Sequence, residues 1–207
     1  MSPVLPSGGR DFCHSILSSA SYTLRMPVQI GASVRDFSDP TGLLSDCHRR
    51  VEMFIGALSK IGELGDRPLT QDERNDLDRA LRYFREAAPK HTADEEESLF
   101  PRLRSMSDPD VQSALEALAR LEEEHRWAAP LHAQVERIGQ QWLADGRLSS
   151  EQKGRFRSAI AELAAMYRAH IEVEERLVFP LAARILSRDE KSAIAEEMAD
   201  RRSFERR

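Results

Sequence analysis

The sequence predicts an all-α protein: an antiparallel up-down-up-down four-helix bundle with a short C-terminal fifth helix and an irregular N-terminal tail. From Leu43 onward, apolar residues recur with the 3.6-residue period of amphipathic helices. The connections between these segments are short, which favours antiparallel neighbours. Aromatic residues make up only 6%, and ten Gly and ten Pro are sparse for a sandwich or barrel. A chain of 207 residues can bury a sizeable core and still carry a tail.

The first 40 residues differ from the rest because they are rich in Ser, Gly and Pro and show no sustained period. They lack the charged segment and apolar stretch of a secretory signal. Residues 10–35 have a weak likeness to a transit peptide, and Met26 is an alternative start that would make residues 1–25 an extension. We therefore divide the chain into a tail (1–40), a metal-binding bundle (41–187) and a C-terminal helix with a charged tail (188–207).

Capping signals set the expected helix ends. Thr70 with Glu73 three residues later is a capping box, and Gly146 closes the third long segment. Ser149 or Ser150 caps the fourth. The sequence predicts helices over residues 43–64, 70–104, 110–145, 149–186 and 188–202.

Charge and cysteine content narrow the functional class. The 30 basic and 35 acidic side chains give a net charge of −5, which argues against a general nucleic-acid binder. Cys13 and Cys47 cannot build a disulfide scaffold and suit a reducing compartment, so we expect a cytoplasmic protein. No apolar run approaches the roughly 20 residues of a membrane helix, so no membrane partner is expected. The oligomeric state stays open.

An internal repeat is the sharpest signal in the sequence. One copy runs from His91 through Glu95 to Pro101, and the other from His170 through Glu174 to Pro180. Both read HxxxEExx[LV]FP. Residues at i and i+4 lie on one helix face, so each copy aims an imidazole and a carboxylate at the same point.

Both imidazole–carboxylate pairs fall on apolar stripes that face the bundle interior. A buried carboxylate without a partner is costly, so such a layer requires cations. By contrast, Glu122 to Glu124 and the arginines of the tail are expected to be solvated. The stripe residues are Leu77, Leu81, Phe84, Ala88 and Leu99 in the second helix, and Phe156, Ile160, Leu163, Tyr167 and Leu177 in the fourth.

The first and third helices complete the predicted shell with one histidine each. His48 lies on the inner stripe of the first helix. In the third, His125 is about as far from the connecting turn as His170 is, whereas His132 lies about 10 Å further along the axis. We assign His125 as the ligand and keep His132 as its rival. In the favoured assignment, His132 and Glu136 form a second shell, an access path or a proton relay.

Imidazole plus carboxylate without thiolate suits iron or manganese, and sometimes zinc. Four histidines and two glutamates exceed what a single ion with an open position requires. They suit two ions bridged by the carboxylates. The predicted metal ligands are His48, His91, Glu95, His125, His170 and Glu174.

Residues 40–187 resemble the hemerythrin-like (HHE cation-binding) proteins, because of the paired His-x-x-x-Glu segments that end in Phe-Pro. This resemblance implies a non-haem di-iron centre inside a four-helix bundle. Manganese stays the alternative metal because the same donor types suit it. The resemblance also implies that the four histidines are terminal ligands and that Glu95 and Glu174 are the bridges.

Two departures separate this chain from the oxygen-carrying hemerythrins. Ala129 stands where they have a second histidine in the third helix, and the fourth helix has HxxxE instead of HxxxxD. Fewer imidazoles favour reaction with peroxide, O2 or NO over reversible oxygen carriage. We expect a role in oxidative stress, with peroxide decomposition as the candidate enzyme activity, and Tyr167 hydrogen-bonding a bound oxygen species or ligating iron. The alternative is a non-catalytic sensor or iron store that signals through helix repacking. A metal-free structural bundle is a third reading.

Overall fold

The computed structural model describes residues 39–203, and within this range it contains helices joined by short connections and no strand. The predicted N-terminal tail lies outside the described residues. No helix within the described range combines the length and apolar character needed to cross a membrane. These helices form four long, nearly continuous helical segments, which we call rods. The first rod is α1 (Pro40–Gly62), and the third is α5 (Pro109–Asp145). The second rod comprises α2 (Gln71–Arg82), η1 (Tyr83–Ala87), α3 (Ala88–Ala93), η2 (Asp94–Leu99) and α4 (Phe100–Ser105). The fourth comprises α6 (Ser150–Val173), η3 (Glu174–Val178) and α7 (Phe179–Ile185), and α8 (Arg188–Ser203) follows it.

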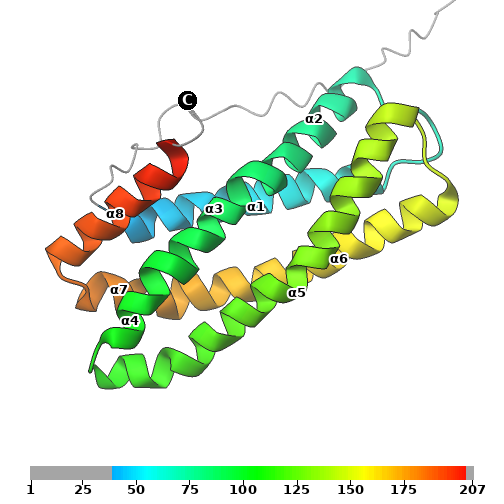
Figure 1. The fold of residues 1–207 in the computed structure, drawn as a ribbon. Coiled ribbons are helices and arrows are strands. Elements are labelled where there is room, and N and C mark those ends of the chain that lie inside the picture. The colour runs from blue at the N-terminus through cyan, green and yellow to red at the C-terminus, as the bar shows by residue number, and fades with distance from the viewer. Residues whose placement is uncertain (1–38, 204–207) are drawn as a thin grey trace, which may run out of the picture. The chain divides into compact units, whose positions relative to one another are not determined.

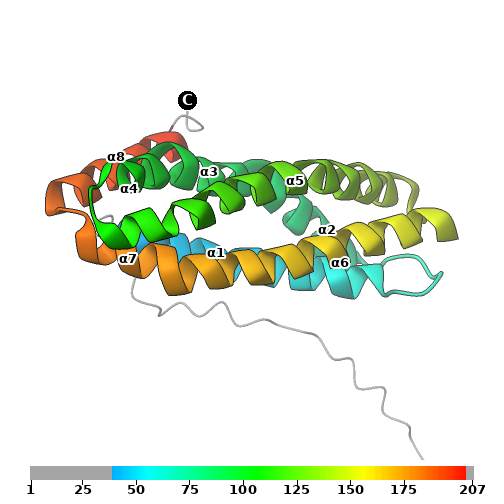
Figure 2. The ribbon, with the colours of Figure 1, turned by 90° about the horizontal axis from the view of Figure 1, so that it is seen from below.

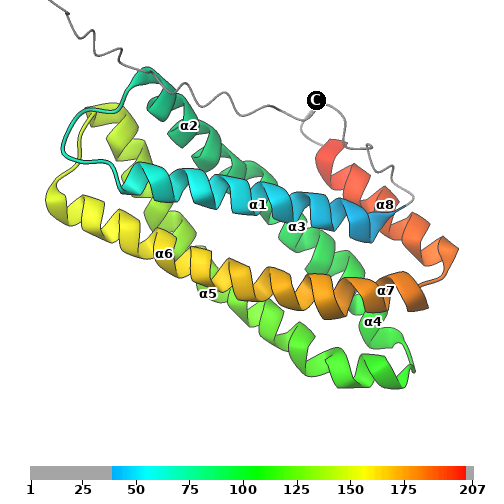
Figure 3. The same ribbon diagram turned by 180° about the vertical axis from the view of Figure 1, so that it is seen from behind.

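The four rods form an antiparallel bundle. Each packs against the rods adjacent to it in sequence, and the first also packs against the fourth. The contacts pair α1 with α2 and α6, and α5 with the same two helices. Figures 1 and 3 show these rods from opposite sides. The second and fourth rods, which carry the repeated motif, are therefore diagonal partners. The predicted all-α bundle with a short fifth helix is confirmed.

Side-chain caps start the rods where the sequence predicts or close to it. The Thr70 capping box with Glu73 is formed, and Ser149 makes a second one with Gln152. Gly146 ends α5 with a φ of 73°, a left-handed conformation that glycine adopts without a Cβ penalty. The first helix begins three residues earlier than expected, because the Asp39 carboxylate accepts a hydrogen bond from the Gly42 N–H.

Three π turns interrupt the second and fourth rods, and each ends two residues before a proline. A proline within a helix has no N–H and its ring clashes with the carbonyl four residues back, so a wider turn relieves the clash. The extra residue also rotates the face that follows. Our expectation that Leu177 lies on the inner stripe is therefore wrong. Leu177 is 40% exposed, and Val178 is buried instead.

The core of the described residues consists of two large apolar clusters separated by a polar layer, and a small third cluster of Val111, Ala114 and Leu181. Along each rod the sequence passes from one cluster through the polar residues into the other. In α1, for example, Leu44 belongs to one cluster, Val51 to the other, and His48 lies between them. The apolar clusters exclude water from both sides of the layer, which strengthens electrostatic interactions within it.

We expect Gly139→Ala to destabilise the fold by about 1 kcal/mol. A Cβ at this position would lie 2.7 Å from Cδ1 of buried Leu81, and overpacking of this kind costs about 1–3 kcal/mol. The gain in helix propensity of about 1 kcal/mol offsets only part of that. Gly154→Ala is the matched control, because nothing lies within 4 Å of its Cβ position. Urea unfolding should show a gain for this control, and equal gains in both variants would contradict the packing argument.

The fifth helix, α8, packs against the second rod, where that rod carries the copy of the motif that begins at His91. Figure 2 shows it beside α3 and α4, and its contacts include η2. The expectation that its terminal arginines are solvated is wrong, because Arg201 and Arg202 both pair with Asp94, at 3.0 and 2.6 Å. Asp94 is completely buried, so the two guanidinium groups compensate a charge that would otherwise be costly. Because Arg201 also donates to the Ser98 hydroxyl, α8 fixes the turn that carries Glu95.

Candidate metal centre

The polar layer contains two overlapping groups of potential metal donors. The first group is His48, His91 and Glu95, and the second is Glu95, His125, His170 and Glu174. Within each group, one donor atom from every residue lies within 4.8 Å of the others. The structure thus brings all six of the predicted ligand residues together, one or two from each of the four rods. Their individual roles as ligands stay a prediction.

Each carboxylate lies between histidines of both groups. Oε2 of Glu174 is 3.0 Å from Nε2 of His48, and Oε1 of the same carboxylate is 3.3 Å from Nε2 of His170. The Glu95 carboxylate likewise lies between two imidazoles: its Oε1 is 3.2 Å from Nε2 of His91, and its Oε2 is 3.6 Å from Nε2 of His125. Two carboxylates that each join two imidazoles match the arrangement of bridging ligands.

The donor set fits a metal centre because the inward-facing atoms are buried without hydrogen-bond partners. Glu95 and Glu174 are both fully buried. Within residues 39–203, neither oxygen of either carboxylate has a hydrogen-bond partner, and neither does Nε2 of His48. Burying a carboxylate in this way is expensive unless a cation neutralises it. Nitrogen and oxygen donors without thiolate suit iron, manganese or zinc.

Three of the four histidines are held by carboxylates on their outer ring nitrogens. The Nδ1 atoms of His48, His125 and His170 lie 2.8, 2.8 and 2.9 Å from carboxylate oxygens. An Nδ1–H that donates to a carboxylate leaves the Nε2 lone pair pointing inward and makes the ring a stronger ligand. The His48 ring also stacks on Phe179 of the motif, with centroids 5.2 Å apart. The carboxylates belong to Glu175, Glu96 and Glu124, respectively.

These outer carboxylates were missed in the sequence analysis. Glu96 and Glu175 are the second glutamates of the two HxxxEE motifs, and each reaches a histidine on a neighbouring rod. Their duplication at the same motif position was the signal that could have found them. For Glu124 the expectation of a solvated charge is wrong, because its carboxylate accepts from His170. The position of Glu124 directly before His125 in the sequence gave no indication that it contacts His170.

Without a cation, the charges of the layer are balanced by protons. Burial opposes protonation of His48, but Glu174 and Glu95 outweigh it and raise its pKa to about 11. Burial likewise opposes protonation of His170, and Glu174 outweighs it and raises the pKa to about 9. Burial and the Glu174 charge raise the pKa of Glu95 to about 8. An entering metal ion displaces these protons, so its binding releases protons and weakens as the pH falls.

The rival histidine, His132, lies outside both donor groups. Its Nε2 is 2.8 Å from the Tyr167 hydroxyl, and its ring stacks on Phe84 with centroids 4.9 Å apart. Burial lowers the pKa of His132 to about 4, so it is neutral at pH 7. Tyr167 in turn lies edge-on to His170, at a centroid distance of 6.4 Å. Glu136 does not join this contact, because its carboxylate pairs with Arg85 at 2.7 Å.

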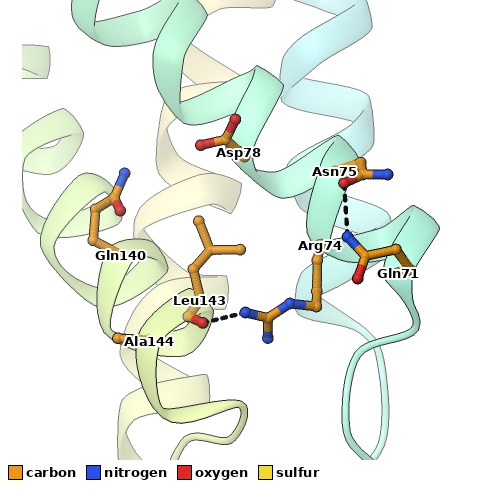
Figure 4. A pocket seen from close by; sticks show the side chains of 7 residues that line it. All are labelled: Gln71, Arg74, Asn75, Asp78, Gln140, Leu143 and Ala144. Carbon is orange, nitrogen blue, oxygen red and sulfur yellow. Dashed lines mark hydrogen bonds between the residues drawn. The ribbon is translucent and has the colours of Figure 1, made fainter.

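A polar hollow between α2 and α5 is remote from this centre. Figure 4 shows its lining, in which Arg74 donates to the Leu143 carbonyl and Gln71 donates to Asn75 at 2.9 Å. Gln71 precedes His91 by 20 residues, which is about 30 Å along a helix. These groups satisfy one another and tie the start of α2 to the end of α5.

Comparison with known proteins places this chain in a family. The hemerythrin HHE cation-binding domain matches residues 39–182, so the chain belongs to the hemerythrin family and is a cation-binding protein. It is also 30% identical over 169 residues to an uncharacterised protein of Haemophilus influenzae, covering 80% of this chain and 91% of that protein. The matched range contains both donor groups and ends before α8.

Proposed function

We propose that this protein is a non-haem di-iron protein that reacts with small oxidants, and that it decomposes hydrogen peroxide. The observation that carries the proposal is the sharing of carboxylates between two donor groups, which would hold two ions at bridging distance. His48 and His91 would serve one iron, and His125 and His170 the other. Glu95 and Glu174 would bridge them.

Iron is favoured over other metals by the composition of the first group. Two histidines and one carboxylate are the donor set of non-haem Fe(II) sites that keep open positions. When bound, iron supplies Lewis acidity and one-electron redox chemistry toward a small oxidant. Manganese accepts similar donors and is the alternative cofactor.

The chain's own residues then position the oxidant and handle protons. Tyr167 can orient an oxidant by a hydrogen bond, because its hydroxyl donates or accepts next to the centre and is itself held by His132. The neutral His132 ring holds the Tyr167 hydroxyl in place through this hydrogen bond. The apolar clusters on both sides exclude water from the layer. Cytoplasmic residence is part of the proposal, since a chain with two cysteines cannot build a disulfide scaffold and suits a reducing compartment.

Metal analysis combined with peroxide turnover tests the proposal. The purified protein should contain about two irons per chain, and peroxide should yield oxygen and water in the ratio of dismutation. His125→Ala should lose iron, whereas His132→Ala should retain it. Folded full-length protein that binds no transition metal when reconstituted would overturn the proposal. Iron loss confined to His132→Ala would overturn the ligand assignment.

A sensor of O2, NO or iron is the second candidate function. The observation that favours it is the link between α8 and the turn that carries Glu95, because Arg201 and Arg202 both hold Asp94. A change at Glu95 would therefore reach the surface helix. A single stoichiometric spectral change without continued oxygen release, accompanied by protease sensitivity of α8, would favour the sensor over the enzyme.

We expect Tyr167→Phe to keep its iron and to release oxygen about tenfold more slowly than the parent protein. The change removes one hydrogen bond worth about 1.5 kcal/mol, which corresponds to tenfold in rate. Tyr83→Phe is the matched control, since its hydroxyl bonds the Cys47 carbonyl at 3.3 Å and not His132. Oxygen-electrode rates at equal iron content measure the effect. Unchanged turnover in Tyr167→Phe would remove this tyrosine from the reaction.

A further inference from the structure

One of the four predicted histidine ligands, His91, lacks an outer carboxylate. Each of the other three has a glutamate at its Nδ1 atom. Nδ1 of His91 is buried and has no hydrogen-bond partner within residues 39–203. His91 as a whole is only 6% exposed, so this atom lies away from bulk water. The first donor group therefore contains one ligand that is not held from outside.

The three outer contacts that do form follow a repeated pattern. The second glutamate of each motif contacts the histidine of the first or the third rod. The third rod makes the reverse contact, because Glu124, directly before His125, contacts His170 of the fourth rod. By the same pattern, the residue directly before His48 on the first rod would hold His91 of the second.

That residue is Cys47, so a thiol stands where the pattern requires a carboxylate. Cys47 lies on the side of α1 that faces the second rod, because its carbonyl accepts from the Tyr83 hydroxyl. It also lines a pocket together with Lys90, the residue directly before His91. The short Cys47 side chain makes no hydrogen bond to Nδ1 of His91.

The missing carboxylate affects where the proton of a neutral His91 ring resides. A neutral imidazole carries one N–H and binds a metal through its other nitrogen. A proton on Nε2 faces Oε1 of Glu95 at 3.2 Å, whereas a proton on Nδ1 is buried without an acceptor. These contacts favour the proton on Nε2, the nitrogen that faces the other donors. Before Nε2 can bind a cation, the ring must give up this arrangement, and the resulting Nδ1–H is unsatisfied.

We propose that Cys47, by leaving His91 without an outer carboxylate, makes the first donor group release its cation faster than the second. Outer partners of ligating histidines change metal affinity by roughly 10–100-fold, and a weaker site releases its ion sooner. The first group also has three members, whereas the second has four. At limiting metal, the chain should therefore fill the second group first. This inference rests on the two-ion centre of the proposed function and not on its peroxide chemistry.

Release of Co²⁺ from the loaded full-length protein into excess chelator, followed by visible absorbance, tests this inference. We expect a fast and a slow phase of about one ion per chain each, and Cys47→Glu should slow the fast phase about tenfold. The pocket of about 240 Å³ beside Cys47 leaves room for the longer side chain. Cys47→Ser is the matched control, because it removes the thiol without adding a carboxylate, and it should release cobalt as the parent protein does.

The reciprocal substitution, Glu124→Cys, identifies the slow phase with the second group. It removes the outer carboxylate of His170 and should speed the slow phase about tenfold. Glu123→Cys is its control, since Glu123 is the exposed neighbour. This variant requires no new contact, so it tests the inference even if Cys47→Glu does not fold.

Two results would overturn the inference and leave the two-ion centre standing. One is a slow phase that Glu124→Cys leaves unchanged, and the other is a folded Cys47→Glu protein that releases cobalt at the parent's rates. Uptake of fewer than two cobalt ions per chain by the parent protein would instead overturn the two-ion centre and, with it, this inference.

Discussion

Glu95→Gln is expected to lose both metal ions, and with them the stabilisation that the metal gives to the folded chain. Glu95 belongs to both donor groups, so its loss weakens both, and a neutral amide cannot neutralise two cations. We expect the iron content to fall from about two to below one per chain, and the rise in melting temperature on adding iron to disappear. Metal analysis and thermal unfolding with and without iron measure the two effects.

The same substitution should leave the metal-free fold intact. Because burial and Glu174 raise the pKa of Glu95 to about 8, its carboxyl is mostly protonated at pH 7 in metal-free protein. Glutamine has nearly the shape and charge of that protonated acid. Glu172→Gln is the control, since Glu172 is exposed on the fourth rod and pairs with Arg176. A Glu95→Gln protein that retains two irons would contradict the bridging role.

The second large effect is expected at the ion pairs that Arg201 and Arg202 of α8 form with Asp94 of η2, which we call the clamp. Replacing both Arg201 and Arg202 with Gln leaves the fully buried Asp94 without a counter-charge. Removing the partners of a buried charge costs about 3–5 kcal/mol. We expect the free energy of unfolding of metal-free protein to fall by that amount in urea titrations.

A double-mutant comparison separates this charge effect from general loss of packing. Adding Asp94→Asn to the double variant should restore most of the lost stability, because the buried charge is then gone. Arg176→Gln, which breaks an exposed i,i+4 pair, should cost about 0.5 kcal/mol or less. If the double variant loses less than about 1 kcal/mol, or if Asp94→Asn restores nothing, the clamp does not act through charge.

The fold and the approximate location of the site could be predicted from the sequence, because both depend on local periodicity. Capping boxes at Thr70 and Ser149 start helices, and the apolar stripes orient them. Counting residues from the turn between the third and fourth helices placed His125, and not His132, at the depth of His170, since helices have a fixed rise. The role of His125 as a ligand stays a prediction. The duplicated motif then pointed to a paired centre.

What the sequence did not reveal depends on contacts between rods and on departures from 3.6-residue periodicity. Leu177 was misplaced because a π turn before Pro180 adds a residue that a constant 100° rotation does not include. Glu124 and the two arginines of α8 looked like surface charges, since their partners lie 46 residues or more away in the chain. The sequence of one helix does not show which charged side chain of another rod will contact it.

The clamp on Asp94 also orders events during synthesis. Arg201 follows Asp94 by 107 residues, so at the usual translation rate of 5–20 residues per second the acid waits roughly 5–20 s for its counter-charge. Until then the turn that carries Glu95 has no support from α8. A nascent chain therefore gains this support for the turn that carries Glu95 only after α8 has been synthesised.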